Sequence, residues 1–195
     1  KKPYLHVTDN AIMNSRILRS LLNSSVKHFI FFSCTVMYQS SKKALSENDF
    51  SESDSIYKNY FGVGWTKVYI EKMCEFYSRL NQNKYTLIRH SNIYGPYDNY
   101  SLEDGHVIPS LIHRCYLNKK SNDKFMIRGT GKPLRQFIYS HDLALLIMWT
   151  LENYKKKDTI ILSVSEKDEV SIKNVGELIA KKFNYEHMIE FNNNY

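Results

Sequence analysis

The stretch KYTLIRH, residues 84–90, decides the fold, because it is a short run of strand-forming residues set between two helical patterns. Two further apolar runs, HFIFFS at residues 28–33 and TIILSVS at residues 159–165, are separated from it by helical patterns. Strands that alternate with helices are typical of a parallel sheet covered by helices. We therefore predict an α/β protein in which these three strands are parallel neighbours.

Apolar residues at helical spacing predict five helices, over residues 10–25, 65–80, 106–117, 141–154 and 170–183. The second helix carries an apolar stripe that we expect to pack in the core, formed by Trp65, Tyr69, Met73, Phe76 and Leu80. Ser171 stands where a side chain would cap the start of the fifth helix.

The composition argues against several classes of protein. The net charge of +7 would attract anions, but the basic residues are scattered and no known nucleic-acid module is present. Cys34, Cys74 and Cys115 are odd in number and show no CxxC spacing, which argues against a metal site or a disulfide framework and favours a reducing compartment. No apolar run has the length of a membrane span. We expect a cytoplasmic protein without metal, nucleic-acid or membrane partners.

The glycines do not form a dinucleotide fingerprint. A Rossmann fold holds pyrophosphate on a GxGxxG turn between its first strand and helix. GVGW at residues 62–65 lacks the third glycine, and GTGKP at residues 129–133 is not a P-loop because no serine or threonine follows the lysine. Weak or absent binding of a dinucleotide cofactor by this chain alone is therefore expected.

Three segments together resemble the GDP-L-fucose synthases, a family of extended short-chain dehydrogenases/reductases within the NAD-dependent epimerases/dehydratases. They are residues 89–114, residues 128–154 and residues 160–173. The resemblance implies a partial Rossmann-like parallel sheet with helices on both faces, plus part of a small substrate-binding domain. Residues 1–105 would be the distal part of the nucleotide-binding domain. Residues 106–195 would be mostly substrate-domain segments, with 136–165 returning to the sheet.

The resemblance also implies an activity. The family converts GDP-4-keto-6-deoxy-D-mannose to GDP-L-fucose by 3,5-epimerisation and an NADPH-dependent 4-reduction. The expected ligands are a GDP-sugar substrate and NADP, and the expected assembly is a homodimer formed through helices that include the one bearing Lys67. Relative to the family, the chain would lack the N-terminal strands with the glycine fingerprint and a C-terminal piece of the substrate domain.

The chemical positions of the family are only partly kept. Lys67 matches the catalytic lysine, but the tyrosine position four residues earlier is Val63. Cys34 stands at the serine position, and Val36 at the position of the epimerising cysteine. His106 matches the partner histidine of that cysteine. Lys67 and Cys34 should meet at the carboxyl ends of their elements, facing an open cleft.

The binding positions implied by the resemblance are mixed as well. Asn92, together with Lys67 and His106, would contact the cofactor, while Arg114 and Arg135 would grip the GDP-sugar diphosphate. Without the resemblance, Lys67 would be an ordinary helix lysine and the arginines ordinary surface charges. Two functions stay open: a sugar-nucleotide epimerase–reductase, or a catalytically inactive relative that serves as a binding or scaffold module.

Overall fold

The computed structural model describes residues 3–41, 43–80, 83–156 and 158–192. The described residues fall into two compact units, one within residues 1–91 and 146–162 and the other within residues 92–145 and 163–195. The boundaries of these units differ from those of the predicted functional division. That division placed a boundary after residue 105 and assigned residues 136–165 to the sheet again. That functional division stays a prediction.

The first unit is built on a three-stranded parallel sheet. Its strands are β1 (His28–Cys34), β2 (Lys84–His90) and β7 (Thr159–Leu162), in the order β1-β2-β7. Both pairings are parallel, with Ser33 opposite Arg89 and Cys34 opposite His90. The predicted α/β class and the three parallel neighbours are confirmed.

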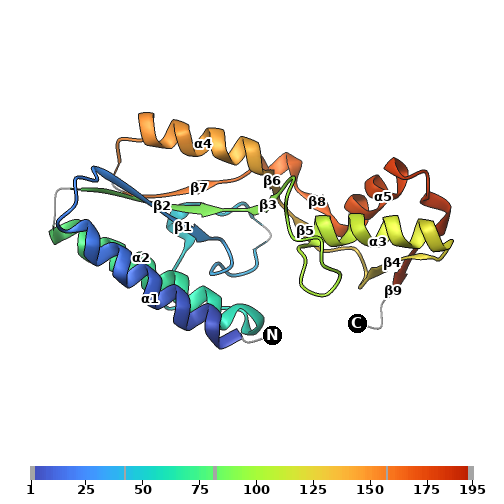
Figure 1. Ribbon diagram of the computed structural model, residues 1–195, viewed down its shortest axis with the longest axis horizontal. Coiled ribbons are helices and arrows are strands. Elements are labelled where there is room, and N and C mark those ends of the chain that lie inside the picture. Colours follow the sequence, from blue (N-terminus) through green and yellow to red (C-terminus); the bar gives the residue numbers. More distant parts are fainter. Residues whose placement is uncertain (1–2, 42, 81–82, 157, 193–195) are drawn as a thin grey trace. The chain divides into compact units, whose positions relative to one another are not determined.

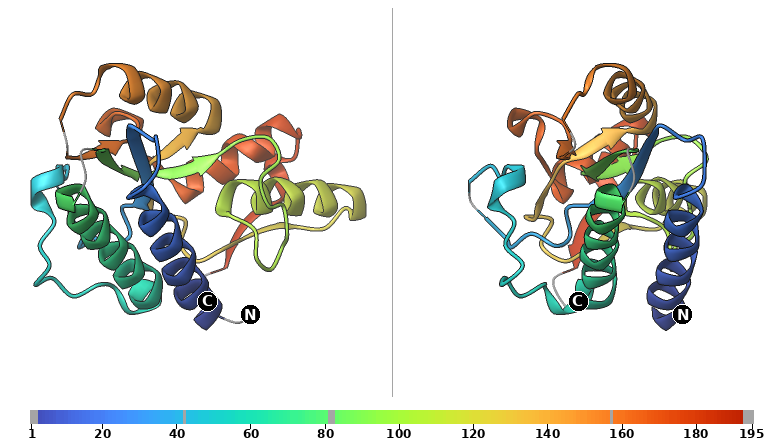
Figure 2. Two further views of the ribbon diagram at one scale, coloured as in Figure 1. Left: turned by 60° about the vertical axis from the view of Figure 1, so that its left-hand side comes forward. Right: turned by 90° about the vertical axis from the view of Figure 1, so that its left-hand side faces the viewer.

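Helices lie on both faces of this sheet. The helices α1 (Pro3–Leu21) and α2 (Phe61–Leu80) run side by side on one face (Figure 1, Figure 2). Their contacts with the sheet enclose a core that contains Leu18, Phe31, Ile70, Cys74 and Tyr85. The part of α4 (Ser140–Asn153) that belongs to this unit covers the other face. Because α2 connects two parallel strands, it runs opposite to them, so its first turns lie near their carboxyl ends.

The apolar stripe of α2 does not pack as the sequence predicts. Tyr69, Phe76 and Leu80 are each more than half exposed, whereas Trp65 and Met73 are half-buried. The buried face of α2 is formed instead by smaller or polar residues, namely Gly64, Thr66, Val68, Ile70, Glu71 and Cys74. The helix has apolar residues on two faces, and contact with the sheet selects the face with the closer-packing side chains.

The second unit combines short strands with helices. β3 (Asn92–Tyr94) pairs with β6 (Phe137–Tyr139), and β4 (Phe125–Arg128) pairs with β9 (Ile189–Asn192), both in parallel. β5 (Leu134–Arg135) pairs antiparallel with β8 (Val170–Ser171).

The α-helices that lie wholly within this unit are α3 (Val107–Ser121) and α5 (Ile172–Lys182). They enclose a core that includes Leu111, Cys115, Phe125, Ile127 and Ile179. Ser171 caps α5 as predicted, since its hydroxyl accepts the backbone N–H of Asn174 at 3.0 Å. In the part of the chain that the structure describes, no helix combines the length and the apolar character needed to cross a membrane.

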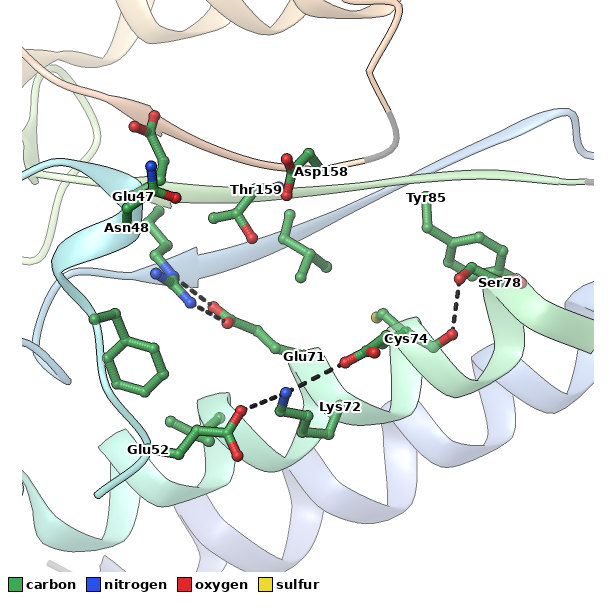
Figure 3. A pocket seen from close by; sticks show the side chains of 15 residues that line it. Glu47, Asn48, Glu52, Glu71, Lys72, Cys74, Ser78, Tyr85, Asp158 and Thr159 are labelled. Atoms are coloured by element: carbon green, nitrogen blue, oxygen red, sulfur yellow. Dashed lines mark hydrogen bonds and ion pairs between the residues drawn. The ribbon is translucent and has the colours of Figure 1, made fainter. Parts of the chain in front are cut away.

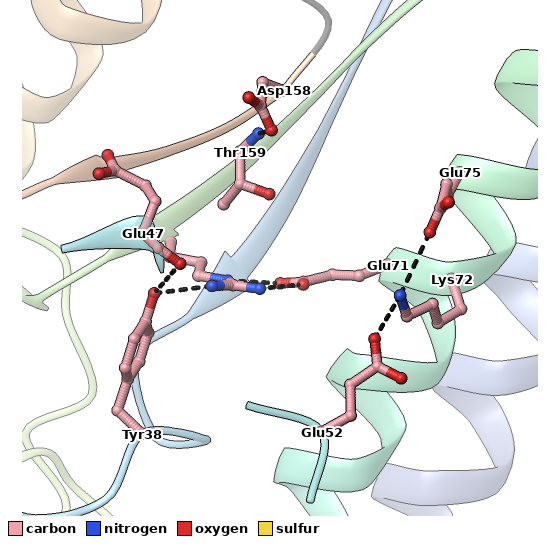
Figure 4. A network of polar contacts seen from close by, with 9 residues as sticks. Tyr38, Glu47, Glu52, Glu71, Lys72, Glu75, Asp158 and Thr159 are labelled. Carbon is pink, nitrogen blue, oxygen red and sulfur yellow. Dashed lines mark hydrogen bonds and ion pairs between the residues drawn. The ribbon is translucent and has the colours of Figure 1, made fainter. Parts of the chain in front are cut away.

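A buried ion pair ties α2 to the central strand. Arg89 of β2 donates to both carboxylate oxygens of Glu71, from Nε at 3.1 Å and from Nη2 at 2.6 Å, and both side chains are 6% exposed. Figure 3 and Figure 4 show Glu71 reaching from the helix to this two-pronged contact. Such bidentate geometry fixes direction as well as distance.

Further groups complete the surroundings of Arg89. Its Nη1 donates to the Tyr38 hydroxyl at 2.7 Å, and its guanidinium lies over the rings of Tyr38 and Phe50 at 5.3 and 4.6 Å. Burial opposes the charge on Arg89, but the bonds from Glu71 outweigh that effect and raise the pKa of the guanidinium. Each of the three guanidinium nitrogens thus donates a hydrogen bond, and Arg89 remains charged.

Replacing Glu71 by glutamine should destabilise the fold by about 3–5 kcal/mol, because it leaves the Arg89 guanidinium buried without a counter-charge. The free energy of unfolding from urea denaturation measures the effect. The exposed pair of Lys173 and Glu177, 3.7 Å apart, supplies the matched control, and Glu177→Gln should change stability by less than about 0.5 kcal/mol. Equal losses in the two variants would contradict the structural role of the buried pair.

Candidate functional site

Lys67 lies in the second turn of α2 and reaches the edge of the sheet. Its Nζ donates to the backbone oxygen of Phe32 at 2.7 Å and lies 4.9 Å from the centre of the Phe31 ring. Burial lowers the pKa of Lys67, while the neighbouring Cys34 and Glu71 oppose that shift. The sequence places Lys67 correctly on a helix, but in its first half rather than at its carboxyl end, because α2 runs opposite to the strands.

Cys34 is the last residue of β1 and lies close enough to Lys67 for their charges to interact. Burial raises the pKa of the Cys34 thiol, although the backbone N–H of Val36 and the ammonium of Lys67 act in the other direction. The thiol is therefore protonated near neutral pH and is a weak nucleophile. The structure brings Lys67 and Cys34 together, as predicted, while the open cleft expected beside them stays a prediction.

The hydroxyl groups of the two residues next to Cys34 are either buried or hydrogen-bonded. Ser33 is fully buried, and its hydroxyl oxygen has no hydrogen-bond partner among the described residues. Thr35 donates to the backbone oxygen of His90 at 3.4 Å. The Ser33 hydroxyl is therefore enclosed, and the Thr35 hydroxyl is engaged with the backbone of β2.

Val63 lies one helical turn before Lys67, and residues at this spacing share a face of the helix. Tyr60 belongs to the short 3-10 helix Lys58–Tyr60 that precedes α2, and its ring packs against Tyr57 with the centroids 6.0 Å apart. Tyr38 is tied to Arg89, and burial raises its pKa, which makes its hydroxyl a poorer acid. Val63 has no proton to donate, and neither Tyr60 nor Tyr38 takes over that role.

A cavity of about 390 Å³ lies between α2 and the sheet in this unit (Figure 3). Among the described residues, its lining includes the carboxylates of Glu47, Glu52, Glu71, Glu75 and Asp158 and the cations Lys72 and Arg89. Lys72 bonds to both Glu52 and Glu75, as Figure 4 shows. Neither Lys67 nor Cys34 lines this cavity, and its charge would repel a diphosphate.

The remaining predicted site residues belong to the second unit. His106 is the residue before α3, and its Nδ1 lies 2.9 Å from a carboxylate oxygen of Asp98. Asn92 is exposed and donates to the backbone oxygen of Gln136 at 3.0 Å. Asp98 is a contact of the site that sequence reasoning missed, because a pair of residues eight apart in a loop gives no periodic signal.

The two predicted substrate arginines differ in their surroundings. Arg114 of α3 is half-buried and donates to the backbone oxygen of Met126 at 3.3 Å. Burial lowers its pKa, and the nearby charge of Arg128 lowers it further. Arg135 is exposed on β5 and donates to the backbone oxygen of Leu134 at 2.7 Å. The structure adds Arg128 to the cationic group around Arg114, which suits a ligand with negative charge.

The second unit also contains an apolar cleft of about 700 Å³ between α3 and α5. Its lining is dominated by Ile108, Ile112, Phe137, Val175, Leu178 and Phe183. Asp168 and Lys182 contribute one charge of each sign. Neither Arg114 nor Arg135 lines the cleft, so the cationic residues and the apolar cleft are separate features of this unit.

The thiol of Cys34 should react with iodoacetamide only as the pH rises above its ordinary pKa of 9.0, because burial holds it protonated. The measurement is the pH midpoint of alkylation at Cys34, followed by mass spectrometry of the labelled peptide. Lys67→Met should move the midpoint upward, since it removes a cation that favours the thiolate. Lys72→Met, which removes an exposed lysine bound to Glu52 and Glu75, should leave it unchanged. A midpoint below 9 in the unsubstituted chain would contradict the assignment.

The comparisons with known proteins all indicate the same family. The model of the NAD dependent epimerase/dehydratase family matches residues 1–164. The chain is 48% identical over 130 residues to a GDP-L-fucose synthase of Dictyostelium discoideum, a match that covers 67% of this chain and 41% of that protein. It is 42% identical over 132 residues to a probable GDP-L-fucose synthase of Drosophila melanogaster, over 64% of this chain and 41% of that protein.

Solved structures agree with the sequence matches. The crystal structure of a GDP-L-fucose synthetase from Naegleria fowleri bound to NADP superposes with a TM-score of 0.90 at 32% identity, over 96% of this chain and 60% of that one. The matched part thus spans about two fifths of the length of the two curated relatives and three fifths of the crystallised one. The chain belongs to the NAD dependent epimerase/dehydratase family, as a GDP-L-fucose synthase-like member.

Proposed function

We propose that the chain serves a GDP-L-fucose synthase-like function and recognises a GDP-linked 4-keto sugar. The retained Lys67 and His106 and the cationic group of Arg114 and Arg128 support this proposal. The corresponding reaction of the family is the 3,5-epimerisation and NADPH-dependent 4-reduction of GDP-4-keto-6-deoxy-D-mannose. Guanidinium groups match the geometry of a diphosphate, so Arg114 and Arg135 are proposed to hold the GDP moiety.

NADP, which is present in the similar Naegleria structure, fits the described residues at one end only. The Lys67 ammonium donates to a backbone carbonyl and would exchange that bond for one to a ribose hydroxyl, and Asn92 carries an exposed amide. No stretch of the sequence supplies the glycine turn that would hold the pyrophosphate. The described residues therefore fit the cofactor only in part.

One observation decides which form of the function is favoured: Val63 lies one turn before Lys67 on α2, where the family has its proton-donating tyrosine. A valine side chain has no proton to give, and a positioned acid contributes roughly 10²–10⁴-fold to a rate. Val36 likewise carries no ionisable group at the position of the epimerising cysteine. These two positions favour the second candidate function, a relative that binds the GDP-sugar but reduces it very slowly.

In a full-length protein that carries this sequence, reduction of GDP-4-keto-6-deoxy-D-mannose should be negligible, and Val63→Tyr combined with Cys34→Ser should raise it by roughly 10²-fold or more. NADPH oxidation measures the rate, and calorimetric titration with GDP-sugar measures binding separately. The matched control is Val63→Phe with Cys34→Ser, which adds the ring without the hydroxyl and should give no gain. Robust turnover by the unsubstituted protein would show that another group supplies the proton. Absence of GDP-sugar binding would refute the proposed function itself.

We further propose that the chain forms a homodimer through α1 and α2. Both helices expose large apolar side chains, including Tyr4, Ile12 and Met13 on α1 and Tyr69 and Phe76 on α2. The two helices pack side by side on one face of the sheet. A contiguous apolar surface formed by such residues would be characteristic of a protein–protein contact.

The dimer should dissociate when charge is placed in this surface, because an unpaired buried carboxylate is costly. Sedimentation equilibrium should show a dimer for the unsubstituted chain and a monomer for Phe76→Glu. Leu178→Glu on α5 is the matched control, since Leu178 is 59% exposed and Phe76 is 57% exposed. A monomeric unsubstituted chain, or equal dissociation in both variants, would rule the interface out.

A further inference from the structure

His106 is held by a carboxylate that the family comparison does not assign. Its Nδ1 lies 2.9 Å from Oδ1 of Asp98, and the two side chains differ sharply in exposure, with 74% of His106 and 15% of Asp98 accessible. The same Asp98 oxygen accepts the backbone N–H of Asn99 at 2.7 Å. A second hydrogen bond therefore holds the Asp98 carboxylate in place, whereas most of the His106 side chain is exposed to solvent.

This contact determines where the imidazole carries its proton. An ionised carboxylate can only accept hydrogen bonds, so the ring nitrogen that faces Asp98 must be the one that bears hydrogen. Neutral His106 then has its proton on Nδ1 and a lone pair on Nε2. The lone pair lies on the other side of the ring from Asp98, toward the exposed edge. Such an imidazole can accept a proton at Nε2.

The loop that carries both residues is braced by its own hydrogen bonds. The Ser101 hydroxyl accepts the backbone N–H groups of Glu103 and Asp104, each at 3.2 Å, and the N–H of Gly105 bonds to the backbone oxygen of Ser101 at 2.9 Å. A Cβ at Gly105 would lie 2.3 Å from that oxygen and 2.5 Å from the backbone oxygen of Asn99. Only glycine fits so close an approach, and it fixes the backbone immediately before His106.

Backbone strain at the other end of the loop points the same way. Tyr97, directly before Asp98, has φ of 66° and a fully exposed side chain. A bulky residue in the left-handed region costs free energy and persists where the surroundings require it. Here the residue with positive φ directly precedes the carboxylate that contacts His106. Strain and close packing thus both maintain one carboxylate–imidazole contact.

We infer that Asp98 is a positioning residue for His106: it fixes the Nδ1-protonated tautomer and the ring direction, so that Nε2 is presented as a proton acceptor to a bound sugar. This inference rests on the proposed function for the identity of the ligand, a GDP-linked keto sugar whose carbon-bound protons next to the carbonyl are acidic. The arrangement follows the general pattern of a carboxylate that orients a functional histidine.

The test is the tautomer of His106 in the 195-residue chain, measured by ¹⁵N-histidine NMR at about pH 8.5, where an ordinary histidine is neutral. His106→Gln assigns the signals. The unsubstituted chain should show hydrogen on Nδ1, and Asp98→Ala should abolish that preference. Glu103→Ala, which removes an exposed carboxylate from the same loop, should leave it intact.

His113 provides an internal reference, since its Nδ1 lies 2.8 Å from the backbone oxygen of Tyr100 and should stay protonated in every variant. If Asp98→Ala does not fold, Asp98→Asn carries the test, because its amide can donate to Nδ1 as well as accept and should also abolish the fixed preference. An unchanged His106 tautomer in the Asp98 variant, or hydrogen on Nε2 in the unsubstituted chain, overturns the inference.

A second arm separates this inference from the proposed function. In the full-length protein, Asp98→Ala should lower the rate at which the carbon-bound protons next to the carbonyl of bound GDP-sugar exchange with solvent deuterium, roughly 10–10²-fold, without weakening the binding of GDP-sugar. A loss of binding instead of exchange would overturn the positioning role. If the protein binds no GDP-sugar at all, the proposed function fails, while the tautomer measurement still decides the role of Asp98.

Discussion

The ion pair between Arg89 and Glu71 is the constraint on which the first unit depends. Two charges in the core are expensive, and such a pair contributes little net stability compared with apolar residues of the same size. What it supplies is direction, because the two-pronged contact allows only one rotation of α2 about its own axis. Lys67 lies one turn before Glu71 on that helix, so the same rotation carries its ammonium to the edge of β1. The arrangement of the candidate site follows from an interaction that has no chemical role of its own.

The sheet could be predicted from sequence because its information is local. The runs at residues 28–33 and 84–90 are too apolar for loops and too short for helices, and the helix between them requires a parallel connection. The buried face of α2 could not be predicted in the same way. Periodicity detects large apolar residues such as Tyr69 and Phe76, but it does not distinguish a surface that packs against a sheet from one left exposed.

The parts of the candidate site that were missed are contacts between residues distant in sequence or outside regular elements. Arg89 within a buried strand was one available signal, since a charge there requires a partner. Asp98 and Arg128 gave no such signal, because a loop aspartate and a strand-end arginine are ordinary surface residues until the fold places them beside His106 and Arg114. The roles of Lys67, Asn92, Arg114 and Arg135 came from family resemblance, and the structure supplies their surroundings rather than their chemistry.

The hydrogen bond from Lys67 to the backbone oxygen of Phe32 sets a threshold for any ligand of that lysine. A hydrogen bond from an ammonium to a carbonyl contributes about 1.5–3 kcal/mol. A ligand must replace this bond before its own contact with Lys67 adds to its binding free energy. A free-energy cost of that size corresponds to roughly a tenfold to hundredfold reduction in apparent affinity. Lys67 therefore selects its ligands by competition. A weak hydrogen-bond acceptor leaves the ammonium bound to the Phe32 carbonyl. Only a ligand that offers a better acceptor, or that is bound there through other contacts, displaces the ammonium from the strand.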